Sequence, residues 1–209
     1  MAESDFQASP PLLRSVLYMP GANERALKKA QELPADALIL DLEDAVAPAD
    51  KERARELAVA AVHRGRLAPT TAIRVNGRGT PWWEDDLRAA AEARPDVVVL
   101  PKVESPEDVS AAAALLPEGT GLEAQIETAR GLAEAERVAA VGCGLEALVL
   151  GPADLAASLG IPVLTIGAGT PDYALARVAA AARAHGLQPI DGPHARLGDD
   201  LGLVVSARR

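Results

Sequence analysis

The chain has 209 residues, 49% of them hydrophobic and 24% charged, which is the composition of a globular protein rather than a disordered one. Its 21 Lys and Arg residues against 30 Asp and Glu residues give a formal net charge of −9, which argues against nucleic acid as a partner. The first residues lack the basic region of a signal peptide, and no apolar run approaches the ~20 residues of a membrane helix. A single cysteine, Cys143, suits a reducing compartment, so we expect a soluble cytoplasmic protein with no membrane partner.

Short aliphatic runs alternate with longer helical patterns along the whole chain. Most of these runs are continuously apolar, which is typical of parallel strands covered on both faces. The predicted strands are Ser15–Met19, Ala37–Leu42, Ala72–Asn76, Val97–Leu100, Leu122–Ile126, Ala147–Leu150 and Leu187–Ile190.

Helical patterns fill the segments between the predicted strands. Ser105, Pro106 and Asp108 form an N-terminal capping pattern at one of them. Lys51–Arg55 (KERAR) is interpreted as a solvated helical face. The predicted helices are Ala22–Glu32, Lys51–Arg64, Trp83–Ala93, Pro106–Leu116, Arg130–Val141, Pro152–Leu159, Tyr173–His185 and Leu197–Arg209.

Three consecutive spacings of about 25 residues between strand starts fit strand–helix units, and seven such units in a row favour a (β/α)₈ TIM-type barrel over an open doubly wound sheet. We therefore expect one domain over residues 1–209, with residues 1–12 as a flexible extension. An eighth strand has no counterpart before Arg209. The barrel is then open, completed by a partner, or a C-terminally shortened version of a longer one.

Ionisable and amide side chains follow the predicted strands, at the end where active sites of parallel barrels lie. The strand-end residues are Asp41, Glu43, Asp44, Arg74, Asn76, Lys102, Glu127, Asp154 and Asp191. Carboxylates that converge in a pocket repel one another unless a cation neutralises them, and Mg²⁺ prefers such oxygen ligands. Arg74 suits a substrate carboxylate or an enolate oxygen. This combination favours chemistry at a carbon–carbon bond next to a carbonyl.

The chain resembles the citrate lyase β-subunit-like branch of the HpcH/HpaI aldolase superfamily. The motifs LDLEDAV, LPKVES and IET with a downstream GxxDL are together specific, whereas each alone is weak. The matching segments are RSVLYMPGAN (14–23), ALILDLEDAVAPADKERAR (37–55), IRVNGRGTPWWEDDL (73–87), DVVVLPKVESPEDV (96–109), QIETARGL (125–132), ALVLGPADLAASLG (147–160) and PIDGP (189–193).

The resemblance implies a (β/α)₈ barrel that assembles as a trimer or hexamer. It implies a Mg²⁺-dependent lyase that acts on a 3-hydroxyacyl-CoA thioester, such as citryl-, malyl- or citramalyl-CoA. The enzyme would cleave this thioester to a ketoacid and an acetyl thioester, or form it from them. The residues it implies are Glu127 and Asp154 as metal ligands, Glu43 and Asp44 around the metal's waters, Arg74 on the ketoacid and enolate, and Arg14 with Lys102 toward the CoA portion.

Several alternatives stay open at this point. The base is Asp44, a metal-bound hydroxide or a residue of another subunit. The thioester belongs to CoA or to a carrier protein. Residues 161–172 (IPVLTIGAGTPD) are expected to form a loop beside the substrate. A catalytically inactive lyase-like scaffold and an aldolase acting on free ketoacids are the rival functions.

Overall fold

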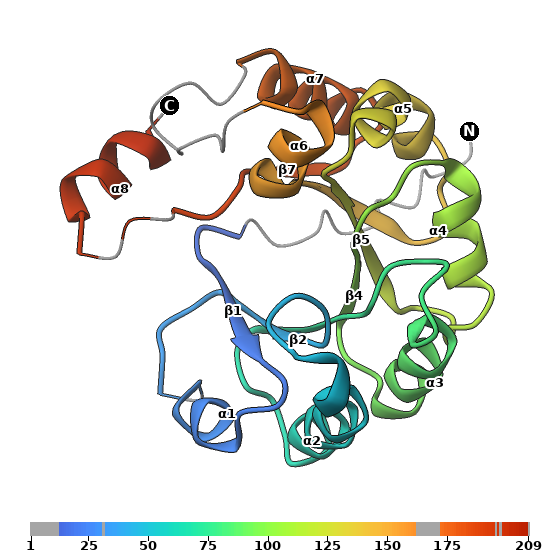
Figure 1. Cartoon of the computed structure of the whole chain (residues 1–209), viewed down its shortest axis with the longest axis vertical. Coiled ribbons are helices and arrows are strands. Elements are labelled where there is room, and N and C mark those ends of the chain that lie inside the picture. The colour runs from blue at the N-terminus through green and yellow to red at the C-terminus, as the bar shows by residue number, and fades with distance from the viewer. Residues whose placement is uncertain (1–12, 31, 162–171, 195, 197, 209) are drawn as a thin grey trace, which may run out of the picture.

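The computed structural model describes residues 13–30, 32–161, 172–194, 196 and 198–208. Its centre is one parallel sheet in which seven strands pair in chain order, from β1 to β7 (Figure 1). The expected extension over residues 1–12 and all but the two ends of the expected loop over residues 161–172 lie outside the described residues.

All seven predicted strands are present, with ends shifted by no more than two residues. Within the described ranges, β1 and β7 are the edges of the sheet and no eighth strand joins them. The fold is therefore a curled seven-stranded α/β sheet that matches a TIM-like barrel without its eighth strand. The strands are β1 (Val16–Pro20), β2 (Ala37–Asp41), β3 (Thr70–Arg74), β4 (Val97–Leu100), β5 (Gly121–Ile126), β6 (Leu145–Leu150) and β7 (Gln188–Ile190).

Helices surround the outside of this sheet, while α8 lies apart beyond its open side (Figure 1). The capping pattern predicted at Ser105 is confirmed, because the Asp108 carboxylate accepts a hydrogen bond from the Ser105 backbone N–H at the start of α4. None of the helices described is long and apolar enough to cross a membrane. The helices are α1 (Glu24–Ala30), α2 (Lys51–His63), preceded by the 3₁₀ turn η1 (Pro48–Asp50), α3 (Trp83–Ala93), α4 (Pro106–Ala113), α5 (Ala129–Ala139), α6 (Pro152–Leu159), α7 (Asp172–Ala184) and α8 (Asp200–Ala207).

Side chains of each strand alternate between the helix-facing and the inner surface of the sheet. Leu38, Leu40 and Ile73 belong to the large core shared with the helices. Ile39 and Val99 belong to a much smaller apolar cluster on the other face. Burial of the first group holds the helices against the sheet, since apolar area removed from water is the main stabilising contribution to folding.

The inner face is unusually polar, and β5 contributes most of that polarity. Glu123, Gln125 and Glu127 alternate with buried apolar residues and are themselves nearly inaccessible to solvent. On β2 and β3, Asp41 lies opposite Arg74 in the strand register. The pleat therefore directs a row of charged and amide groups along the inside of the sheet toward its carboxyl end.

Lys51 corrects the interpretation of residues 51–55 as a solvated face, because it is buried at the first position of α2. Its ammonium donates hydrogen bonds of 2.7 Å to the backbone carbonyls of Leu42 and Glu43 and to Oδ1 of Asn76. Charge-assisted hydrogen bonds of this kind are about twice as strong as neutral ones. Lys51 thus fixes the segment that follows β2 against the end of β3.

Replacing Lys51 with Met is expected to lower the free energy of unfolding by about 3 kcal/mol, since buried acceptors lose a charged donor. Denaturant unfolding followed by circular dichroism measures the change. The same substitution at Lys28, an exposed residue of α1, serves as the control. Equal unfolding midpoints for the two variants would show that Lys51 does not hold this segment.

Glu123→Gln is expected to stabilise the protein only at higher pH. Burial, reinforced by the nearby Glu146, raises the pKa of Glu123 from 4.5 to about 7. Between these values the unfolded chain ionises while the folded chain stays protonated, so the wild type loses stability as the pH rises through this window. Glutamine does not titrate, so the free energy of unfolding of the variant should exceed that of the wild type by on the order of 2–3 kcal/mol at pH 8. At pH 4.5 the two proteins should be equally stable.

Thermal melts of wild type and Glu123→Gln at pH 4.5, 6 and 8 test this. Glu118→Gln, at an exposed position, is the control. A stability difference between wild type and Glu123→Gln that stays constant across the series would contradict the prediction.

Candidate active site at the carboxyl end of the sheet

Acidic side chains that follow three of the strands, β2, β5 and β6, meet at one end of the sheet. Glu43 and Asp44 follow β2, Glu127 follows β5, and Asp154 lies in the first turn of α6, just after β6. Lys102 follows β4 and lies among them. Parallel strands place their carboxyl ends together, which explains why residues far apart in the sequence become neighbours here.

The Lys102 ammonium is the point on which these carboxylates converge. Its Nζ donates a short hydrogen bond to Glu43 Oε1 and lies 2.9 Å from Asp154 Oδ2. It lies 3.9 Å from carboxylate oxygens of both Asp44 and Glu127. Burial lowers the pKa of Lys102, but hydrogen bonds to Asp154 and Glu43 outweigh that effect and raise it above its usual range. The structure therefore brings together five of the seven predicted site residues, which we call the carboxylate cluster and its lysine.

Glu127 is the most buried carboxylate of the cluster, with a side chain only 3% exposed. Its Oε1 accepts a 2.9 Å hydrogen bond from the Lys102 backbone N–H, and its Oε2 accepts one of 2.5 Å from Gln125 Nε2. Burial is the main reason why its pKa rises to about 7; Lys102 opposes the rise, whereas Glu43 and Asp154 add to it. A positive charge close to Glu127 therefore stabilises its ionised form.

Gly151 gives Glu127 the room that it occupies. A Cβ at position 151 would lie 2.5 Å from Glu127 Cβ and would overlap its Oε2. It would also approach Gln125 Nε2 to 3.1 Å. The absence of a side chain directly after β6 is therefore part of the site.

Arg74 lies inside the sheet, where Asp41 and Glu43 surround its guanidinium. Its Nε and Nη2 donate 2.7 Å hydrogen bonds to the two oxygens of Asp41, and its Nη1 lies 3.1 Å from Glu43 Oε2. The Tyr18 ring lies beneath it, 4.9 Å from the guanidinium carbon. This geometry makes Arg74 a positioning residue for Glu43. Its contact with a substrate carboxylate stays a prediction.

The cluster has the oxygen donors that a hard divalent cation requires. Burial raises the pKa of Glu43, although Lys102 and Arg74 lower it; among the residues described, its buried Oε2 makes no hydrogen bond and is approached by the Arg74 ion pair at 3.1 Å. Gln125 Oε1 is a second buried acceptor without a hydrogen bond to these residues. In the part of the chain described, no three His, Cys, Asp or Glu side chains already form a metal-holding group, and the Lys102 ammonium lies between the acids. Glu127 and Asp154 could hold Mg²⁺ where they now face this lysine.

Arg14 lies away from the carboxylate cluster, and its expected role toward the CoA portion stays a prediction. It precedes β1, at the amino end of the sheet, and its guanidinium forms an ion pair of 2.8 Å with Asp36. Its expected role came from the family resemblance and not from the strand pattern, which already places Arg14 before the first strand. Asp191 is exposed after β7 and its Oδ1 accepts a hydrogen bond from the Gly192 N–H.

Gln125 and Lys51 are residues of this region that the sequence analysis missed. Gln125 is visible in the alternation of Glu123, Gln125 and Glu127, which the prediction of a continuously apolar strand overlooked. The sequence pattern does not predict the role of Lys51, because nothing in a charged helix start shows that one lysine is buried against the carbonyls of Leu42 and Glu43.

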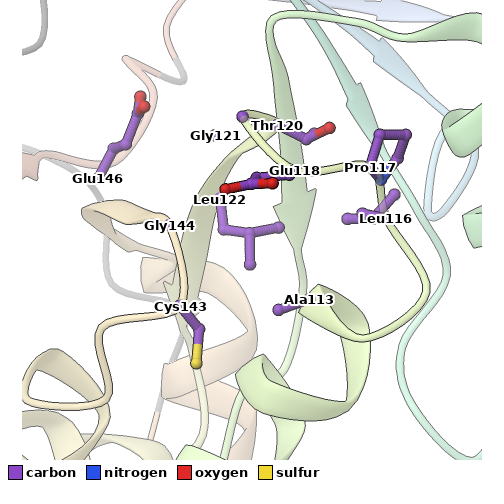
Figure 2. A pocket seen from close by; sticks show the side chains of 11 residues that line it. Ala113, Leu116, Pro117, Glu118, Thr120, Gly121, Leu122, Cys143, Gly144 and Glu146 are labelled. Atoms are coloured by element: carbon purple, nitrogen blue, oxygen red, sulfur yellow. The ribbon is translucent and has the colours of Figure 1, made fainter.

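A hollow at the opposite end of the sheet lies away from the carboxylate cluster (Figure 2). Its lining includes Gly121 and Leu122 at the start of β5 and Cys143 and Gly144 before β6. Its ionisable groups are Glu118, Glu146 and the Cys143 thiol. Figure 2 shows these side chains spread around the hollow rather than gathered at one point.

Comparisons with known proteins find relatives that match most of the chain. The chain is 44% identical over 207 residues to the (3S)-malyl-CoA thioesterase of Cereibacter sphaeroides, covering 94% of this chain and 68% of that protein. It is 35% identical to the L-malyl-CoA/β-methylmalyl-CoA lyase of Rhodobacter capsulatus, covering 98% of this chain and 74% of that protein.

A solved structure of the citrate lyase β subunit of Mycobacterium tuberculosis, complexed with oxaloacetate and magnesium, has the same fold. It matches with a TM-score of 0.79 and 31% identity, over 92% of this chain and 84% of that one. The family model for the HpcH/HpaI aldolase/citrate lyase proteins matches residues 14–206. The chain therefore belongs to the HpcH/HpaI aldolase/citrate lyase family.

Proposed function

We propose that the protein is a Mg²⁺-dependent carbon–carbon lyase. Its substrate would be a 3-hydroxyacyl-CoA-type thioester, such as citryl-, malyl- or citramalyl-CoA, which it cleaves to or forms from a ketoacid and an acetyl thioester. One observation carries the proposal: the Lys102 ammonium lies within 4.0 Å of four carboxylates. These belong to Glu43, Asp44, Glu127 and Asp154. Lyase and magnesium-bound relatives in the same family support it.

Glu127 and Asp154 would hold the metal, with Glu43 and Asp44 accepting hydrogen bonds from water around it. A bound Mg²⁺ would stabilise the negative charge that develops on substrate oxygens as the carbon–carbon bond breaks. Arg74 keeps the Glu43 carboxylate in place through their 3.1 Å ion pair. We propose that the donors of Arg74 that do not face Asp41 also bind the ketoacid carboxylate.

Cleavage requires removal of the proton from the C3 hydroxyl group. The electrons of that O–H bond form the ketoacid carbonyl, the C2–C3 bond breaks, and its electron pair remains on the acetyl thioester as an enolate that then takes up a proton. Asp44 is this chain's candidate for the base, because its side chain is 60% exposed while those of Glu43 and Glu127 are buried. A base needs such access to the substrate.

Thioester hydrolysis is a second candidate, favoured by the 44% identity to a protein named (3S)-malyl-CoA thioesterase. The two reactions differ in their products. A lyase releases glyoxylate and acetyl-CoA from malyl-CoA, whereas a thioesterase releases malate and free CoA. Measuring glyoxylate and free thiol in one reaction of the purified protein with Mg²⁺ separates these functions and also tests for an inactive scaffold.

Further expectations about the whole protein are part of this proposal. We propose that an eighth strand would complete a (β/α)₈ barrel between the edge strands β1 and β7. We also propose that residues 1–209 form a single domain. We propose a homo-oligomer, a trimer or hexamer, in the cytoplasm, and Lys102 near the thioester portion of the substrate. Light scattering of the purified protein tests the oligomer.

Glu127→Ala is expected to abolish Mg²⁺-dependent cleavage of malyl-CoA while the fold stays intact. The change removes a metal ligand from a position where its burial is costly without a cation. Product formation and the far-ultraviolet circular dichroism spectrum are the measurements, with Glu118→Gln as the exposed control. Undiminished activity would refute the assignment of Glu127 to the metal.

Gly151→Ala is expected to weaken Mg²⁺ binding by about tenfold, because the added methyl group displaces the Glu127 carboxylate. Isothermal titration calorimetry measures the affinity. Gly77→Ala, close to Lys102, is the matched control, since a Cβ there meets nothing nearer than 3.9 Å. An equal effect of the two substitutions would contradict the role of Gly151.

A further inference from the structure

We propose that Lys102 is an internal counter-ion that occupies the metal position and that Mg²⁺ must displace to bind. The inference rests on the proposed function, because it concerns the same site. It adds a step to metal binding: the ammonium leaves the carboxylate cluster as the metal enters. The observation behind it is that Lys102 Nζ lies within 4.0 Å of all four carboxylates.

Electrostatics explain why a cation occupies this position in the protein alone. Glu43 and Glu127 are buried and lie close to Asp154, so without a positive charge these groups would repel one another. Arg74 does not replace the lysine there, because Asp41 takes two of its donors. The Lys102 ammonium is therefore the cation that keeps the cluster assembled before a metal arrives.

The same contacts require the ammonium to leave when the metal binds. Mg²⁺ needs the lone pairs of Glu127 and Asp154, and a divalent ion repels an ammonium held at these oxygens. The ammonium and the metal thus compete for one set of oxygens. The apparent affinity for the metal equals the intrinsic affinity multiplied by the fraction of molecules in which the lysine does not occupy the site.

Lys102 can move its side chain without releasing Glu127. The backbone N–H of Lys102, not its side chain, donates the 2.9 Å hydrogen bond to Glu127 Oε1. The Lys102 backbone has a positive φ of 52°. The side chain is 39% exposed and passes Gly77 with its Cδ 3.9 Å from where a Cβ would stand there. Rotation of the side chain alone therefore takes the ammonium out toward solvent.

The experiment compares Mg²⁺ binding to wild type and Lys102→Met by isothermal titration calorimetry at pH 8. Methionine is unbranched like lysine and only one heavy atom shorter, so its cost at a positive φ is similar, but it carries no charge. Binding by the variant is expected to be about tenfold tighter or more, as for a site that the lysine occupies at least nine-tenths of the time. Lys28→Met, which removes a charge from the surface of α1, is expected to leave the affinity unchanged.

Thermal melts give a second readout that does not depend on activity. Without metal, Lys102→Met is expected to melt about 4 °C below the wild type, because the acids lose their counter-ion. Saturating Mg²⁺ should then raise its melting temperature more than that of the wild type. Lys102→Gln provides the same comparison if the methionine variant does not fold.

The outcomes separate the inference from the proposed function. Wild-type protein that binds no Mg²⁺ overturns the metal site and the inference together. Wild-type binding with equal or weaker binding by both Lys102 variants overturns the inference alone, and shows that the ammonium supports the metal rather than competing with it. A gain of the same size in Lys28→Met would assign the effect to net charge and overturn it as well.

Discussion

In-register pairing of parallel strands decides which side chains face the inside of the curled sheet, and the candidate site depends on that constraint. Every second residue of a strand faces inward, so Glu123, Gln125 and Glu127 form one row on β5 and the segment just after it. The same pairing sets Asp41 opposite Arg74. A shift of one residue in either strand would turn these groups into the apolar core.

The charged side chains inside the sheet are balanced in two layers. Deeper in the sheet, Arg74 neutralises Asp41 and approaches Glu43. At the rim, one lysine faces four carboxylates, so the acids outnumber the cations. The inner layer needs no further ion, whereas the outer layer suits one of higher charge. This difference separates the part of the polar interior that supports the fold from the part that can bind a metal and a substrate.

Much of this arrangement could be predicted from the sequence, because it follows from strand order. The rule that strand ends converge found Glu127 and Asp154 before any coordinates, and the structure brings them to the same ammonium. The rule did not select Arg14, which precedes β1 at the amino end of the sheet. It placed Lys102 at the same rim, but it could not show that the ammonium contacts all four carboxylates, because the direction of a side chain depends on local backbone and side-chain angles.

Distance from the reactive rim gives Cys143 an experimental use. It is the single cysteine of the sequence, it is exposed, and it lies in the loop before β6 at the other end of the sheet. A maleimide dye or a surface tether attached to its sulfur would therefore modify the chain at one known point. Immobilised in this way, the molecules would all present their acidic rim outward, with the approach of ions and small ligands unobstructed.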